Sequence, residues 1–127
     1  MSKLRILIVD DEEELVGALV ERLQLRGMEA HGVTSGAEAL VFIQTTELDV
    51  VLLDMKMPGL GGLQVVKKIK AEKPQLQVVL LTGHGSAEDA EKGIECGAFD
   101  CLMKPIKIEE LCQVLGRAAG CQEPPAP

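Results

Sequence analysis

Five acidic residues follow an apolar segment close to the start of the chain. The stretch "ILIVDDEEEL" has four apolar residues and then the acids from Asp10 to Glu14. Neighbouring like charges repel, and the repulsion grows where the dielectric constant is low. A positive charge is therefore expected near any of these acids that the fold buries.

Three further polar residues stand at the ends of apolar runs. These are Asp54, Thr82 and Lys104, and a proline follows the lysine directly. Each has a purely structural interpretation, as a loop cap, a helix-entry residue or a surface lysine. Likewise, acids such as Glu12–Glu14 are favoured at a helix N-terminus. The repeated position after an apolar run nevertheless favours a shared chemical role.

Apolar runs alternate with helical patterns and predict five strand–helix units. Unbroken apolar runs indicate strands buried on both faces, whereas apolar residues three or four apart indicate helices. "SGAE" and "SAED" have the spacing of a capping box at a helix start. The predicted strands are Leu4–Asp10, Met28–Val33, Val50–Asp54, Gln77–Thr82 and Cys101–Lys104, and the predicted helices are Glu13–Arg26, Glu109–Ala118 and three more around Leu40, Val66 and Ala90.

This order predicts an α/β fold, a doubly wound five-stranded parallel sheet, (βα)5, with the flavodoxin-like order 2-1-3-4-5. Five strands are too few for a TIM barrel. In open sheets of this kind, ligands bind beyond the carboxyl ends of the strands. Asp10, Asp11 and Asp54 should then share one pocket, with Thr82 and Lys104 beside it.

Three clustered carboxylates predict a bound cation. They would repel one another and raise one another's pKa values, and a hard cation such as Mg²⁺ relieves that repulsion. A metal, a hydroxyl and an amine around one carboxylate provide the positioning and charge stabilisation that phosphoryl transfer requires. The sequence therefore predicts a Mg²⁺-dependent phosphoryl acceptor.

Composition narrows the remaining possibilities. The 127-residue chain is 46% hydrophobic and carries a net charge of −7, so we expect no direct contact with nucleic acid and none with anionic lipid. No apolar run is long enough for a membrane span and no signal peptide is evident, so a cytoplasmic protein is predicted. The four cysteines have no zinc-like spacing and are interpreted as small apolar residues in a reducing compartment.

Four motifs resemble the receiver domain of two-component response regulators. They are "VDDE" at Val9–Glu12, "LLDMKMPGLGG" at Leu52–Gly62, "LLTGHG" at Leu80–Gly85 and "MKPI" at Met103–Ile106. The resemblance covers the chain from Lys3 to about Gly120. It implies a receiver domain at residues 1–120, and the Pro-rich residues 121–127 are predicted to be a tail or the start of a linker.

The resemblance implies a role for each site residue. Asp54 would be the phosphoacceptor and a metal ligand, and Thr82 and Lys104 would hold the phosphoryl oxygens. Asp11 would bind Mg²⁺ directly, Asp10 through water, and Lys56 through its backbone carbonyl. Gly83 would leave the approach to the aspartate open, and Pro105 would follow the lysine, often through a cis bond.

One position departs from the family pattern. Three residues before the lysine, the family usually has Tyr or Phe, a ring that moves with the threonine and reaches the output face. Here the position holds Cys101. In the family, the positions of Lys56 and His84 border the path of the water that hydrolyses the aspartyl phosphate. Neither side chain is suited to align that water, so slow self-dephosphorylation is predicted.

The predicted function is a signalling switch rather than a turnover enzyme. Asp54 would accept a phosphoryl group from a sensor histidine kinase or a phosphotransfer protein. The signal would pass through the fourth helix, the fifth strand and the fifth helix, with a homodimer that forms on phosphorylation. Two alternatives stay open: a small phosphatase, for which Lys56 stands where a second acid is wanted, and a flavin carrier, for which the acidic first loop is a poor phosphate site.

Overall fold

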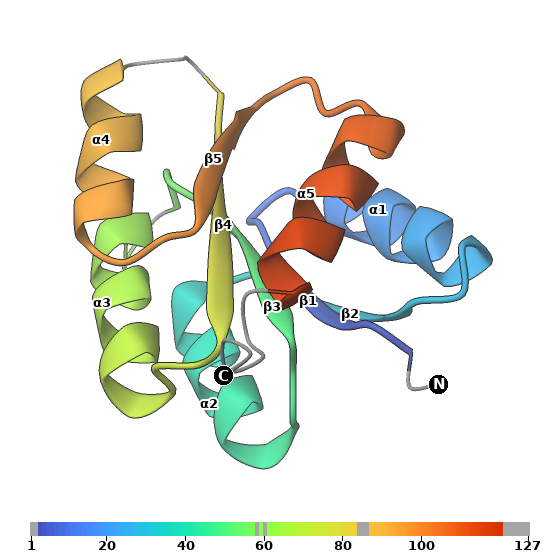
Figure 1. The fold of residues 1–127 in the computed structure, drawn as a ribbon, viewed down its shortest axis with the longest axis horizontal. Helices are drawn as coiled ribbons and strands as arrows, with labels where there is room; N and C mark the ends of the chain where they lie inside the picture. Colours follow the sequence, from blue (N-terminus) through green and yellow to red (C-terminus); the bar gives the residue numbers. More distant parts are fainter. Residues whose placement is uncertain (1–2, 58, 60, 84–86, 121–127) are drawn as a thin grey trace, which may run out of the picture.

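The computed structural model describes residues 3–57, 59, 61–83 and 87–120. Strands and helices alternate throughout this part of the chain, as the sequence predicts (Figure 1). The elements are β1 (Arg5–Val9), α1 (Glu13–Leu25), β2 (Glu29–Val33), α2 (Gly36–Thr45), β3 (Val50–Asp54), α3 (Gly62–Glu72), β4 (Gln77–Thr82), α4 (Ala87–Glu95), β5 (Asp100–Met103) and α5 (Ile108–Gly120). The predicted bounds that we gave differ from these by at most two residues.

The five strands form one parallel sheet in the predicted order, β2-β1-β3-β4-β5. Helices α1 and α5 cover one face, and α2, α3 and α4 cover the other (Figure 1). Because side chains alternate along a strand, Ile6 and Ile8 pack under α1 and α5, while Leu7 and Val9 pack under α2 and α3. Both faces are covered, and the buried polar residues of the described chain, Asp10, Asp54 and Thr82, lie at or just past the carboxyl ends of strands.

Local signals explain where the elements begin and end. Ser35 caps α2, because its hydroxyl accepts a hydrogen bond from the Glu38 amide at 3.1 Å. Gly27 follows α1 with φ +82°, a conformation that a side chain disfavours. The second capping motif begins at Ser86, which lies outside the described residues. None of the described helices is long and apolar enough to cross a membrane.

Candidate functional site

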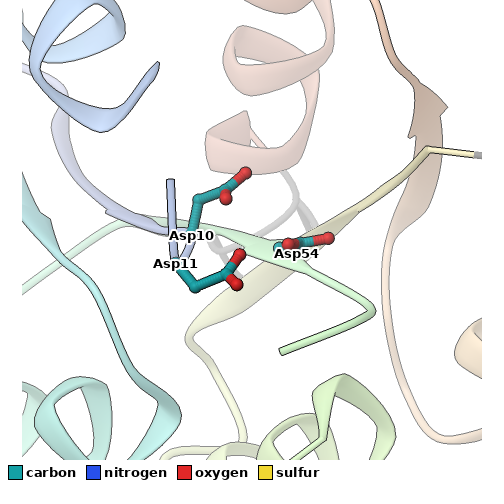
Figure 2. Close-up of side chains that lie close together, drawn as sticks. All are labelled: Asp10, Asp11 and Asp54. Atoms are coloured by element: carbon teal, nitrogen blue, oxygen red, sulfur yellow. The ribbon is translucent and has the colours of Figure 1, made fainter. Parts of the chain in front are cut away.

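Three carboxylates meet at the carboxyl edge of the sheet. Asp10 and Asp11 follow β1, and Asp54 ends β3, its hydrogen-bonded neighbour. One oxygen atom from each of the three lies within 4.8 Å of those of the other two (Figure 2). The structure therefore places the three acids in one pocket, as the strand order predicts.

The backbone around the acids holds them in place. The Glu12 amide donates to Asp10 Oδ1 at 2.9 Å, and the Lys56 amide donates to Asp54 Oδ1 at 3.3 Å. A Cβ at Gly62 would lie 2.7 Å from Met55 Cα and 2.9 Å from the Asp54 carbonyl oxygen. Only glycine therefore lets the start of α3 pack directly against the strand end that carries Asp54.

Lys104 reaches the acids from β5, the edge strand on the far side of β4. It follows β5, its amide donates to the Thr82 carbonyl at 2.8 Å, and its peptide bond to Pro105 is cis. Its ammonium nitrogen lies 3.0 Å from Asp10 Oδ2 and 3.8 Å from Asp54 Oδ2. The expected positive charge beside the acids is thus supplied in part by the protein itself.

Burial shapes the ionisation of the site. Asp10 is fully buried and Asp54 is 4% exposed. Burial, together with the charges of Asp10 and Asp11, raises the pKa of Asp54 to about 6, against the opposing hydrogen bond from Lys56 and the charge of Lys104. Burial lowers the pKa of Lys104, but its close contacts with the carboxylates of Asp10 and Glu12 and the charge of Asp54 outweigh this and raise the pKa overall.

The donor set fits a hard divalent cation. Within the described part of the chain, Asp10 Oδ2 is buried without a hydrogen-bond partner, because its approach to Lys104 is poorly directed for one. Among the described residues, Lys104 pairs with two of the three carboxylates, those of Asp10 and Asp54, so negative charge remains in excess. Oxygen ligands with excess negative charge are what Mg²⁺ prefers. The cluster of Asp10, Asp11 and Asp54 could therefore hold a metal ion.

Two other predicted residues, Thr82 and Lys56, adjoin Asp54 in the sheet or along the chain. Thr82 ends β4 and is buried, one residue beyond Leu81, which pairs in register with Asp54. Gly83 is exposed next to it, and His84 lies outside the described residues. Lys56 contacts Asp54 through its amide. The role expected for its carbonyl stays a prediction.

Cys101 lies on β5, half-buried, and pairs in register with Leu80. Burial and the charges of Asp100 and Asp89 raise the pKa of its thiol, which disfavours the reactive thiolate. Cys96 and Cys112 are also free thiols, in agreement with the interpretation as small apolar residues, and Cys121 lies outside the described residues.

Sequence reasoning missed one contact at the site. We interpreted Glu12 only as an acid favoured by the helix N-terminus, and it does occupy the N-cap position of α1, but without a side-chain capping bond. Its carboxylate instead accepts a hydrogen bond from Lys104 Nζ at 3.2 Å. The two residues are 92 positions apart, so no local pattern indicates the contact.

Comparison with known proteins agrees with this arrangement. A family model described as the response regulator receiver domain matches residues 6–116. The regulatory protein AtoC of Escherichia coli is 36% identical over 93% of the chain, which spans 26% of AtoC. The transcriptional regulatory protein PrrA of Mycobacterium leprae is 37% identical over 87% of the chain, which spans 48% of PrrA. The chain thus spans about a quarter to a half of these relatives.

A solved structure shows the same fold. The receiver domain protein of Clostridium thermocellum superposes with a TM-score of 0.86 at 34% identity, and the match covers 92% of this chain and 94% of that one. The matches in sequence and in structure therefore agree with the observed site, which has acids after β1 and at the end of β3 and a lysine after β5, in a sheet of order 2-1-3-4-5. The chain belongs to the response regulator receiver domain family.

Proposed function

We propose that this chain is a phosphorylation-dependent switch of a two-component system, with Asp54 as the phosphoacceptor. The observation that carries the proposal is the position of Asp54, which ends β3 in one pocket with Asp10 and Asp11 and faces the Lys104 ammonium. A pKa near 6 leaves the Asp54 carboxylate largely ionised at neutral pH, as a nucleophile must be.

The reaction transfers a phosphoryl group between two proteins. A carboxylate oxygen of Asp54 attacks the phosphorus of a phosphohistidine on a sensor kinase or phosphotransfer protein. The new P–O bond forms as the P–N bond breaks, and the electron pair leaves with the histidine nitrogen. Lys104 and Thr82 then hold the phosphoryl oxygens.

Mg²⁺, held by Asp10, Asp11, Asp54 and the Lys56 carbonyl, would neutralise charge on the transferring group. Asp11 would bind it directly and Asp10 through water. The protein residues supply the remaining positive charge through Lys104, which is only 20% exposed at its side chain. Partial burial makes that charge act more strongly than it would in water.

The phosphoryl group would change the protein through differential contacts. Moving an equilibrium from 1:99 to 99:1 takes about 5.5 kcal/mol. A few charge-assisted hydrogen bonds of about 1.5–3 kcal/mol each can supply this. The output would run through α4, β5 and α5, where Ile94 is 47% and Met103 is 59% exposed, and would promote a homodimer. The solved NtrC4 receiver, 32% identical with a TM-score of 0.88 over 94% of this chain and 98% of that one, is described as a beryllofluoride-activated dimer.

The chain would not act as a turnover phosphatase. Such an enzyme would use a second acid two residues after the nucleophile, and Lys56 occupies that position. We expect the phosphorylated chain to persist for minutes or longer. We also expect a cytoplasmic protein with no membrane contact and no direct contact of this domain with nucleic acid.

Intact mass spectrometry tests the proposal. With a small acyl phosphate and Mg²⁺, the wild type should gain one phosphoryl group, Asp54→Ala should gain none, and EDTA should stop the reaction. Asp100→Asn is the matched control, because it removes a carboxylate elsewhere and should leave labelling intact. Equal labelling of Asp54→Ala would disprove the assignment, and consumption of many donor molecules per chain would favour a phosphatase.

A further inference from the structure

The Lys104 ammonium has three acidic neighbours but only one well-directed hydrogen bond among the described residues. The distance to Asp10 Oδ2 is 3.0 Å, yet that oxygen lacks a hydrogen-bond partner. Asp54 Oδ2 is farther away, at 3.8 Å. The hydrogen bond goes to Glu12 Oε1, at 3.2 Å. The lysine thus lies closest to Asp10, but its directed hydrogen bond goes to Glu12, the most exposed of the three acids.

The proposed function requires the Lys104 ammonium to lie nearer to Asp54 than it does here. A phosphoryl group on Asp54 would have to draw Lys104 Nζ toward its own oxygens. An ammonium has three donors, but its nitrogen occupies one position at a time. Any contact that holds the nitrogen near Glu12 therefore opposes the contact that the phosphoryl group requires.

The backbone of Glu12 is held firmly, whereas its side chain is largely exposed to solvent. Its backbone amide is fixed by the bond to Asp10 Oδ1 at 2.9 Å. Its side chain is 64% exposed, whereas that of Lys104 is 20% exposed. The Glu12 backbone can therefore keep Asp10 in place while the Glu12 carboxylate moves into solvent and releases the lysine. The release then requires no rearrangement of Asp10, Asp11 or Asp54.

We propose that Glu12 is a positioning residue that retains Lys104 away from Asp54 and competes with the phosphoryl group for it. This inference rests on the proposed function, because the competition exists only if Asp54 carries the phosphoryl group. Glu12 thereby sets how tightly the site holds a phosphoryl group without being a ligand for the phosphoryl group or for Mg²⁺. An exposed ion pair is weak, so the effect on affinity should be about two- to five-fold.

The test measures the affinity for beryllofluoride, a phosphoryl mimic, at saturating Mg²⁺. Glu12→Gln removes the charge and keeps the size of the side chain. Glu12→Asp keeps the charge and shortens the reach by one methylene. Glu13→Gln is the matched control, because it removes a charge from the next residue, which is also exposed. Mg²⁺ affinity and melting temperature are measured for every variant.

Glu12→Gln and Glu12→Asp should both bind the mimic about two- to five-fold more tightly than the wild type, while Glu13→Gln should not. Glu12→Asp should leave Mg²⁺ affinity unchanged, which separates retention of the lysine from a general charge effect. Unchanged or weaker mimic binding in both Glu12 variants, with normal binding in the wild type, would overturn the competition. No binding of the mimic to the wild type would instead contradict the proposed function.

Discussion

Charged residues are paired differently at the carboxyl edge of the sheet, where the strands end, and at its amino edge, where the strands begin. At the amino edge, Arg5 donates to both carboxylate oxygens of Asp49, at 3.2 and 3.1 Å, and to Glu47 at 3.0 Å. The Arg5 amide also donates to Asp49, at 2.8 Å. Asp49 and Glu47 raise the pKa of the arginine further. A planar guanidinium matches carboxylates in this way, and each partner is satisfied.

The carboxyl edge leaves its charges unsatisfied. Asp10, Asp11 and Asp54 lie together, and Lys104 pairs with Asp10 and Asp54. Among the described residues, Asp10 Oδ2 lacks a hydrogen bond, and burial raises the pKa of Asp54. The amino edge therefore holds a completed structural network, whereas the carboxyl edge holds an incomplete one that a metal and a phosphoryl group would complete. The contrast teaches that charge balance, rather than the number of charged residues, separates the two roles.

The largest expected effect is a pH dependence confined to the carboxyl edge. Without metal, the raised pKa of Asp54 stabilises the folded state fully below the ordinary value of 3.8, and this contribution is lost as pH rises through about 6. Between pH 4 and 7 the wild type should lose up to about 3 kcal/mol relative to Asp54→Asn. Urea denaturation of both in EDTA checks this. Parallel curves across that range would show that Asp54 is not strained.

Mg²⁺ should stabilise the protein only through the carboxyl edge. A ligand at one hundred times its Kd stabilises the folded state by about 2.7 kcal/mol. We expect this gain for the wild type, and a smaller one for Asp11→Asn at the same Mg²⁺ concentration. Titration calorimetry gives the Kd and urea denaturation gives the gain. An equal gain in Asp11→Asn would exclude Asp11 as a ligand.

Replacing aspartate by asparagine should change the stability in opposite directions at the amino and carboxyl edges. Asp49→Asn removes charge-assisted bonds to Arg5 and should lower stability by about 1–2 kcal/mol, a value reduced for partial solvent exposure. Asp11→Asn in EDTA relieves repulsion and should raise stability by roughly 0.5–2 kcal/mol. Melting temperatures in EDTA suffice. A lower melting temperature for Asp11→Asn would make that carboxylate structural.

The smallest expected effect is at Cys101. Cysteine has no ring that could contact the output face differently in two states, so it has little energy with which to bias them. Cys101→Ala should leave phosphorylation and self-association nearly unchanged, whereas Thr82→Ala should still label, more slowly, but not associate. Sedimentation with and without beryllofluoride checks both. Loss of association in Cys101→Ala would show that the thiol itself transmits the signal.

The sequence was sufficient to predict the fold and the three-acid pocket, because both follow from local patterns. Apolar runs identify the strands, the alternation with helices makes the sheet parallel, and the strand order brings Asp10 and Asp54 together. Bounds shifted by a residue or two, as at β5, where Lys104 follows the strand rather than ending it. Such shifts do not change whether a side chain lies at the carboxyl end or at the amino end of the strands.

Contacts between distant side chains could not be predicted. The bond between Glu12 and Lys104 and the pairing of Arg5 with Asp49 depend on rotamers and on the separation of elements in space. The local sequence around a charged residue at a helix start is the same whether its side chain faces water or a lysine 92 positions away. The direction of the pKa shift at Asp54 followed from clustering, but its main cause, burial, came from the structure.

The half-buried cysteine on β5 also has an optical consequence. The chain contains no tryptophan and no tyrosine, and its two aromatic residues are phenylalanines. The protein is therefore nearly transparent at 280 nm and has no background indole emission. A tryptophan placed at Cys101 would be its single indole, partly shielded from solvent beside Leu80. Its emission wavelength would report the polarity around β5 directly, with no competing signal from elsewhere in the molecule.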